Sequence, residues 1–294
     1  MKWESKLKSA AYRIANILIP DSIYTRLKFK KNLRRWPDLR EPRTFNEKLC
    51  WLKLHHRDSV MSTMVDKADA KQYVADIIGP EYIIPTYGVW SHVEQIDFGL
   101  LPQQFVMKGT HDSGRVIVCA DKSELDIEEA CKEMQRSLDR DFYAITREWP
   151  YKNVPHRIIA EKFIRQSDGG LTDYKFFCFN GHVDCVMVCL DRHIGCPKFY
   201  FFDKDWNFLR LNKRGVAAPD GFTLPRPEGI EKMFEIALIL SKNQPFVRVD
   251  LYNVDGKIYF GELTFYPDGG VDPNILLSTD ERWGKLLDIS NLKN

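Results

Sequence analysis

Two acidic residues lie on neighbouring apolar segments near the end of this 294-residue chain. Asp250 belongs to the segment RVDLY, and Glu262 belongs to the segment FGELT. The dipeptide Asp255-Gly256 between them is typical of a tight turn, so the two carboxylates are expected to meet on adjacent strands of a hairpin. Mg²⁺ prefers oxygen ligands together with substrate phosphates. The pair therefore predicts a magnesium site, and the alternative is a surface hairpin whose acids point to water. Arg248 is expected on the same strand face as Asp250, where it can pair with the carboxylates or stabilise a developing oxyanion.

A loop of small residues follows a lysine in the segment FVMKGTHDSG. Lys108 ends an apolar strand, and Gly109, Ser113 and Gly114 allow backbone N–H groups to approach an anion closely. The combination suits a polyphosphate, although the GxxxxGK[ST] sequence of a P-loop is absent. His111 lies in the same loop and is a further candidate for a phosphate contact. An ordinary hairpin turn beside a lysine is the alternative explanation.

The predicted strand HRIIAEKFI ends in Glu161-Lys162-Phe163-Ile164. Backbone N–H and C=O groups at a strand end can bind the edge of an adenine, and Phe163 and Ile164 can form part of an apolar slot around it. Many strands that leave a protein core have this character, so the segment alone does not identify a nucleotide site.

The elements that must position these residues follow from local patterns. Thr44 and Glu47 are spaced as a capping box at the start of a helix, and Asn180-Gly181 marks a second hairpin. Apolar residues at helical spacing predict helices over 5–19, 61–77, 228–243 and, capped by Ser123, as far as Leu138. Short strands joined by hairpins and mixed with these helices indicate an α+β fold with largely antiparallel sheets.

The composition, 44% hydrophobic and 29% charged, is that of an ordinary soluble protein. No run of about 18 apolar residues is present, and the N-terminus lacks the features of a signal peptide, so a cytoplasmic protein is expected. The seven cysteines include no CxxC pair and are interpreted as reduced, packed thiols. A metal site formed by Cys178, Cys185 and Cys189 is the alternative.

The net charge of +2 is unevenly distributed. Residues 1–48 carry a net charge of +8, concentrated in KFKKNLRRW at 28–36, and the remainder carries about −6. Such a segment can contact an anionic polymer or the inner face of a membrane, and the alternative is a solvated helical face. No nucleic-acid-binding motif accompanies the charge, so no nucleic acid partner is expected.

Taken in order along the chain, these segments resemble the ATP-grasp superfamily. Lys67 in VDKADAK, Lys108 before its loop, EKFI, and the acids of RVDLY and GELT follow the motif order of D-alanine–D-alanine ligases. More narrowly, TFNEKLCWLKL, VDKADAKQYV, IGPEYIIPTYGVW, LPQQFVMKGTHDSG and ELTFYPDGG together resemble the TupA-like ATP-grasp family, from about residue 40 to about 270. That family is associated with gene clusters for teichuronopeptide and other surface polysaccharides.

The resemblance implies a nucleotide site built from named residues. Lys67 and Lys108 would contact ATP phosphates beneath the loop 109–114, and Asp173 would bind the ribose. The adenine hinge would be Glu161, Lys162, Phe163 and Ile164.

The resemblance also implies the metal site and the catalytic groups. Asp250 and Glu262 would bind Mg²⁺, and Arg248 would act beside the transferred phosphoryl group together with Lys108. The ligases carry an Asn two residues after the metal-binding Glu, where this chain has Thr264, and a hydroxyl is a poorer Mg²⁺ ligand. The number of Mg²⁺ ions therefore stays open.

The implied fold is an ATP-grasp fold with two α+β subdomains whose antiparallel sheets grip ATP. The expected parts are a basic helical segment (1–57), the first part of the core (58–105), the small subdomain with loop and hinge (106–165) and the C-terminal subdomain (166–294).

The implied reaction is ATP-dependent formation of an amide from a carboxylate and an amine through an acyl phosphate. A sugar or glycan carboxylate and an amine or amino acid are the expected substrates in surface-polysaccharide synthesis. An ATP-grasp phosphotransferase acting on a glycan and a nucleotide-binding but inactive partner subunit are alternatives within the fold. A glycosyltransferase that uses Asp203 and Asp205 as a DxD metal site is the alternative outside it.

Overall fold

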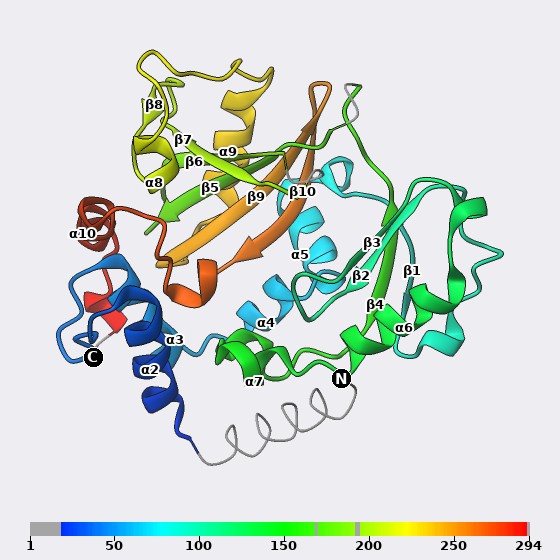
Figure 1. Ribbon diagram of the computed structural model, residues 1–294, viewed down its shortest axis with the longest axis horizontal. Coiled ribbons are helices and arrows are strands. Elements are labelled where there is room, and N and C mark those ends of the chain that lie inside the picture. Colours follow the sequence, from blue (N-terminus) through cyan, green and yellow to red (C-terminus); the bar gives the residue numbers. More distant parts are fainter. Residues whose placement is uncertain (1–18, 168–169, 192–194, 293–294) are drawn as a thin grey trace.

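The computed structural model describes residues 19–167, 170–191 and 195–292. It contains a smaller and a larger antiparallel sheet with helices packed around them, which confirms the predicted α+β class (Figure 1). The helices are α2 (Asp21–Leu33), α3 (Phe45–His55), α4 (Val60–Val65), α5 (Asp69–Ile78), α6 (Ile127–Leu138), α7 (Phe142–Thr146), α8 (Lys213–Val216), α9 (Ile230–Leu240) and α10 (Leu277–Leu286). The strands are β1 (Thr86–Trp90), β2 (Phe105–Gly109), β3 (Val116–Cys119), β4 (Ile158–Lys162), β5 (Asp173–Phe179), β6 (His182–Leu190), β7 (Lys198–Phe202), β8 (Phe208–Leu209), β9 (Phe246–Val254) and β10 (Lys257–Thr264).

The smaller sheet has the strand order β1-β4-β2-β3 and two different faces. On one face, Phe105 and Met107 of β2 pack with Met134 of α6 in a buried apolar cluster. Alternation along the strands puts Lys108 and its register partner Val116 on the other face. Val116 and Val118 of β3 are 53% and 57% exposed there, so the part of this second face over β3 is uncovered.

The larger sheet has the order β10-β9-β5-β6-β7-β8 and is covered mainly by helices from distant parts of the chain. Phe176 of β5 meets Phe234 of α9 on one face with an edge-to-face geometry and ring centroids 5.0 Å apart. Phe177, on the opposite face, stacks on Trp283 of α10 at 4.8 Å. Helix α3 packs against α10, and it begins at the predicted capping box of Thr44 and Glu47, which is confirmed.

Both predicted hairpin turns are confirmed. Asn180 and Gly181 join β5 to β6 with φ values of 47° and 76°, and Asp255 and Gly256 join β9 to β10 with φ values of 51° and 85°. Two successive positive φ values match the right-handed twist of the flanking strands.

Two predicted helices differ from the structure. The helix expected over 61–77 is broken between α4 and α5, because the Asp66 carboxylate accepts hydrogen bonds from the backbone of Ala68 and Asp69. The helix expected to begin at Ser123 begins instead after Asp126, whose side chain accepts from the Glu129 backbone N–H.

Three further sequence expectations concern the N-terminal helix, membrane-spanning segments and the cysteines. The helix predicted at 5–19 lies almost wholly outside the described residues. Within the described part of the chain, no helix has the length and apolar character needed to cross a membrane. Five of the seven cysteines are buried, Cys178, Cys185 and Cys189 among them, and the described residues contain no group of three or more His, Cys, Asp or Glu side chains arranged for a metal.

Candidate active site

The break between α4 and α5 positions Lys67. Its backbone N–H donates to the Thr110 carbonyl at 3.1 Å, and its Nζ donates to the Asp112 carbonyl at 2.5 Å. Asp66 beside it is held by Arg157 at 2.8 Å. Burial lowers the pKa of Lys67 and Lys108 acts in the same direction, whereas Glu262 opposes the shift. The helix break thus fixes Lys67 directly beneath the loop 109–114 and close to the acid of β10.

The predicted phosphate loop is held from below. The His111 ring is buried and stacks on His156 with centroids 3.9 Å apart, and its Nε2 lies 3.0 Å from the Ser137 carbonyl. Burial, and then His156, lower the pKa of His111. In this position His111 supports the loop from its protein side, and its predicted phosphate contact is a proposal that the geometry does not favour.

Close packing explains why position 109 carries glycine. A Cβ added to Gly109 would lie 2.1 Å from the Ser137 Oγ and 2.6 Å from the Asp112 Oδ1. Gly114 has a φ of 97° and open space around it, so its requirement is conformational. Ser113 lines the central cavity described below, and its carbonyl accepts from Arg140 at 2.6 Å.

Glu161 is buried and engaged with two lysines. Its carboxylate lies 2.6 Å from the Lys71 Nζ and 2.5 Å from the Lys108 Nζ. Burial alone raises the pKa of Glu161, but Lys108 and Lys71 outweigh it and leave the pKa below its ordinary value. The side chain therefore orients Lys108 on the same face of the smaller sheet as Val116 and Val118. Any adenine contact at this position would have to come from the neighbouring backbone.

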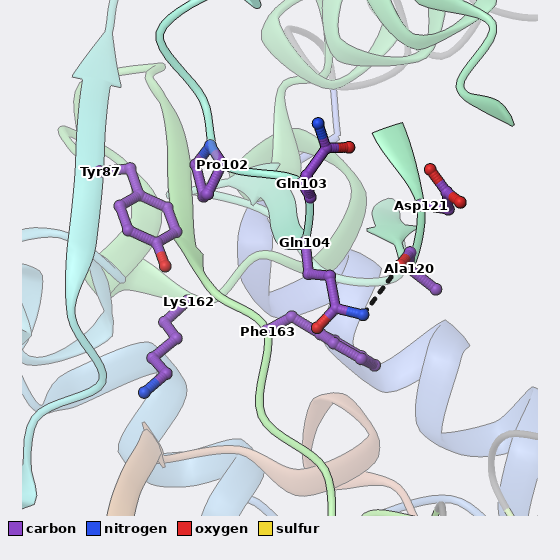
Figure 2. A pocket seen from close by; sticks show the side chains of 8 residues that line it. All are labelled: Tyr87, Pro102, Gln103, Gln104, Ala120, Asp121, Lys162 and Phe163. Atoms are coloured by element: carbon purple, nitrogen blue, oxygen red, sulfur yellow. Dashed lines mark hydrogen bonds between the residues drawn. The ribbon is translucent and has the colours of Figure 1, made fainter. Parts of the chain in front are cut away.

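The rest of the predicted hinge lies at the end of the smaller sheet that is opposite the loop 109–114. Lys162 and Phe163 line an open hollow of about 480 Å³, where Figure 2 shows Tyr87 and Phe163 on opposite sides of the chain. The Lys162 N–H donates to the Pro85 carbonyl at 2.8 Å, so that donor is already used inside the protein. Ile164 follows in the segment leaving the sheet.

The two acids of the β9–β10 hairpin are register partners, as predicted. Asp250 is 2% exposed and is held by Arg248, whose Nε and Nη2 donate to its two oxygens at 2.7 Å each, and by Lys175 of β5. Arg248 also lies 3.4 Å from Glu262 and 3.2 Å from the Thr264 hydroxyl. Asp173 lies on β5 with its Oδ2 3.8 Å from the Lys175 Nζ.

Glu262 is the more open of the two acids, with a side chain that is 42% exposed. Burial raises its pKa, but Lys67, Lys175 and Arg248 together outweigh burial and lower the pKa to about 2. Glu262 is therefore anionic throughout the physiological range. The Glu262 carboxylate is an accessible oxygen donor of the kind that Mg²⁺ prefers. Both oxygens of Asp250 already accept hydrogen bonds from Arg248, and one of them also accepts from Lys175.

One cavity of about 520 Å³ collects side chains from the larger sheet, from the loop between β2 and β3 and from the α4–α5 break. The predicted residues on its wall are Lys67, Ser113, Arg248 and Glu262. Residues that the sequence reasoning missed also line it: Lys175, Lys28 of α2, Glu148, Tyr266, Asp268 and Asp272. The segment DYKFF contained a usable signal for Lys175, since a lysine in an aromatic strand needs a buried partner.

The basic run at 28–36 does not form one solvated face. Lys28 lines the cavity, and Arg35 is paired with Glu47 at 2.5 Å and with Asp280 at 3.1 Å. Lys31 is exposed. The alternative metal string at Asp203 forms a turn, in which its carboxylate accepts from the backbone of Asp205 and Asn207.

Comparison with known proteins defines the class. A sequence model of the TupA-like ATP-grasp family matches residues 47–288. The chain therefore belongs to the TupA-like ATP-grasp family, as its motifs predicted. None of the curated proteins compared with it matches.

Solved structures with a related arrangement include three ligases or synthetases. The D-alanine–D-alanine ligase of Bacillus anthracis, complexed with ATP, is 17% identical, with 78% of this chain and 64% of that chain covered and a TM-score of 0.45. The D-cycloserine synthetase DcsG is 18% identical, with 76% and 69% covered and a TM-score of 0.40. The ATP-grasp ligase PsnB, complexed with a minimal precursor, is 9% identical, with 80% and 62% covered and a TM-score of 0.41. This chain spans less than two thirds of the length of the Bacillus anthracis ligase.

Proposed function

We propose that this protein is an ATP-dependent carboxylate–amine ligase that works through an acyl phosphate. The observation that carries the proposal is the convergence of Lys67, Lys175, Arg248 and Glu262 on one cavity from separate elements of the chain. Three cations around an anionic carboxylate suit a triphosphate whose negative charge is partly neutralised by Mg²⁺. Membership of an ATP-grasp family supports the same assignment.

ATP would lie between the two sheets. Its phosphates would contact Lys67, Lys108 and Lys175 beneath the loop 109–114. Its base would rest on the uncovered face of the smaller sheet, towards the segment 161–164, with Asp173 as the proposed ribose contact. The exposed side chains of Val116 and Val118 supply apolar area on that face.

Glu262 would hold Mg²⁺, and Asp250 would join it once Arg248 and Lys175 bind the phosphates in place of Asp250. When bound, the ion would neutralise phosphate charge and draw the triphosphate into position. The remaining negative charge would be neutralised by cations of the protein. A substrate carboxylate oxygen attacks the γ-phosphorus, and the bond to ADP breaks. Lys175 and Arg248 offset the negative charge that develops on the transferred group. An amine then attacks the acyl carbon, the amide forms, and phosphate leaves.

The family resemblance extends the proposal to substrates and place. The carboxylate would belong to a sugar or glycan precursor, and the product would enter cell-surface polysaccharide synthesis. The protein would work in the cytoplasm, and exposed basic residues such as Arg34 would be available to contact an anionic glycan or the inner membrane face.

Calorimetry tests nucleotide binding. MgATP is expected to bind the wild type, Lys175→Met is expected to weaken binding at least tenfold, and Glu262→Gln is expected to remove the dependence on Mg²⁺. Glu235→Gln is the matched control, because Glu235 is exposed on α9 with only a surface partner, Lys232. The proposal would be refuted if the protein does not bind ATP but binds a UDP- or GDP-sugar.

Turnover separates the reaction types. ADP and phosphate should be released when glucuronate is combined with amino acids, and hydroxylamine should trap the acyl phosphate as a hydroxamate. A stable phosphorylated glycan would instead show a phosphotransferase. ATP binding without ADP release for any carboxylate would indicate an inactive partner subunit.

A further inference from the structure

One part of the wall of the central cavity, the end around Gly269, carries charged groups that are not included in the cluster proposed for phosphates. Lys28 of α2 reaches it from a helix that precedes the family match at 47–288. Glu148, from the segment after α7, lines the same end, as does Asp268 of the turn that follows β10. The site described above uses none of these groups.

The side chains of Lys28 and Glu148 both lie beside Gly269. A Cβ added to Gly269 would lie 2.7 Å from the Lys28 Nζ and 3.8 Å from the Glu148 Oε1, so the two charged atoms are at most about 6.5 Å apart. No described residue forms an ion pair or a side-chain hydrogen bond with the Lys28 ammonium, and Glu148 lies beyond the 4 Å limit of such a pair. The absence of a side chain at Gly269 leaves room for Lys28 to enter the cavity.

A second polar group at this end is also unsatisfied. Tyr266 lines the cavity, is 3% exposed, and its hydroxyl has no hydrogen-bond partner among the described residues. A buried hydroxyl without a partner costs free energy, so its retention points to a polar ligand.

The protonation of Glu148 suits a proton acceptor. Burial raises its pKa to about 7, while Lys53 and Lys28 oppose the rise and Asp268 adds to it. Lys53 is itself engaged by the Gly269 carbonyl at 2.7 Å. Burial, then Lys53, lower the pKa of Lys28, and Glu148 and Asp268 oppose that shift. Near neutral pH, Glu148 can therefore both take up and release a proton.

The spacing fits a small zwitterion. In an α-amino acid the amine nitrogen and the carboxyl carbon are about 2.5 Å apart, and charge-assisted hydrogen bonds span about 2.8 Å. A cation and an anion separated by 4 to 6.5 Å can each bind the opposite charge of one such molecule. A simple amine would offer no anionic group to Lys28, and a simple carboxylate would offer no cationic group to Glu148, whose carboxylate is otherwise near only Thr146 and the cations Lys53 and Lys28 among the described residues that lower its pKa.

We propose that this end of the cavity binds the nucleophile as an α-amino acid, with Lys28 holding its carboxylate and Glu148 holding and then deprotonating its ammonium group. The inference rests on the proposed ligase function and names its amine substrate class. Glu148 takes one proton from the ammonium, and the free amine attacks the acyl phosphate. The C–N bond forms, the C–O bond to phosphate breaks, and the second amine proton leaves with the phosphate. Glu148 then returns its proton to solvent.

The test measures binding by calorimetry or ligand-observed NMR in the presence of Mg²⁺ and a non-hydrolysable ATP analogue. The probes are glycine and both enantiomers of alanine and glutamate, compared with ethylamine and propionate. At least one amino acid should bind at least tenfold more tightly than either single-charge analogue. With Lys28→Met, the amino acid should no longer bind more tightly than ethylamine. With Glu148→Gln, it should no longer bind more tightly than propionate. Lys31→Met, on the exposed side of the same helix, is the matched control and should change neither.

A pH profile supplies a second readout. The rate of amide formation should rise through pH 7 in the wild type and lose that dependence in Glu148→Gln. If MgATP binds but no amino acid exceeds the analogues, or if both variants keep the preference, this inference is wrong and the ligase proposal stands. If MgATP itself does not bind, the proposed function fails first.

Discussion

The contact of Glu161 with two lysines gives the sharpest stability prediction. Glu161→Gln removes the carboxylate that lies 2.6 Å from Lys71 and 2.5 Å from Lys108 while keeping the shape of the side chain. The side chains of Glu161, Lys71 and Lys108 are only 5%, 13% and 18% exposed. Two cations would then face each other with little water to screen them.

The magnitude follows from burial. Removing one partner of a buried ion pair costs about 3–5 kcal/mol. We expect a loss near the lower end, about 3 kcal/mol, because the lysines are slightly exposed and Lys71 keeps its hydrogen bond to the Ile84 carbonyl at 2.5 Å. The same substitution at Glu129, an exposed partner of Arg136 on α6, should cost less than about 1 kcal/mol.

The pKa of Glu161 determines how this difference in stability changes with pH. The folded pKa of Glu161 lies below its ordinary value, so its stabilising contribution is complete above the unfolded pKa of about 4.3 and is lost as the pH falls through the folded pKa. The difference between wild type and Glu161→Gln should therefore be constant from pH 5 to 8 and should shrink in more acidic solution.

The assay is guanidinium unfolding followed by tryptophan fluorescence, for wild type, Glu161→Gln and Glu129→Gln at several pH values. Adding Lys71→Met to Glu161→Gln should recover part of the loss by removing one of the two unpaired cations. A Glu161→Gln variant that is no less stable than the Glu129→Gln control would show that the buried cluster is not a net stabilising interaction.

Three further predictions address the loop, its histidine and the thiols. Gly109→Ala should destabilise the protein by about 1–3 kcal/mol and weaken MgATP binding, because its Cβ would meet Ser137 and Asp112; unchanged melting and affinity would contradict the packing described. The folded pKa of His111 is lowered, so stability should fall as the pH drops below about 6.5, and His111→Gln should reduce that slope in melting curves recorded from pH 7.5 to 5.5. In the native protein Cys196, which is exposed, should react readily with a thiol reagent, whereas Cys178, whose pKa burial raises to about 12, should react only after unfolding; mass spectrometry of labelled peptides distinguishes the two.

The sequence by itself determined the features that depend on neighbouring residues. Asp255-Gly256 predicted its hairpin because consecutive positive φ values are tolerated by few dipeptides. Once the hairpin forms, the period of two places Arg248 beside Asp250, and the register brings Glu262 opposite. The order of short motifs was sufficient for the family.

Only the tertiary structure decided which charged groups meet across long stretches of chain. Glu161 forms an ion pair with Lys71, which lies ninety residues earlier in the chain. Local patterns indicate an adenine hinge at Glu161 instead. Alternation along β5 puts Lys175 on the same face as Asp173 and Phe177, but its partner Asp250 is set by the pairing of β5 with β9. The basic run at 28–36 indicates a surface segment, yet α2 packs so that Lys28 reaches Gly269. Local periodicity fixes the face on which a side chain lies, and the element opposite that face is chosen by the packing of the whole core.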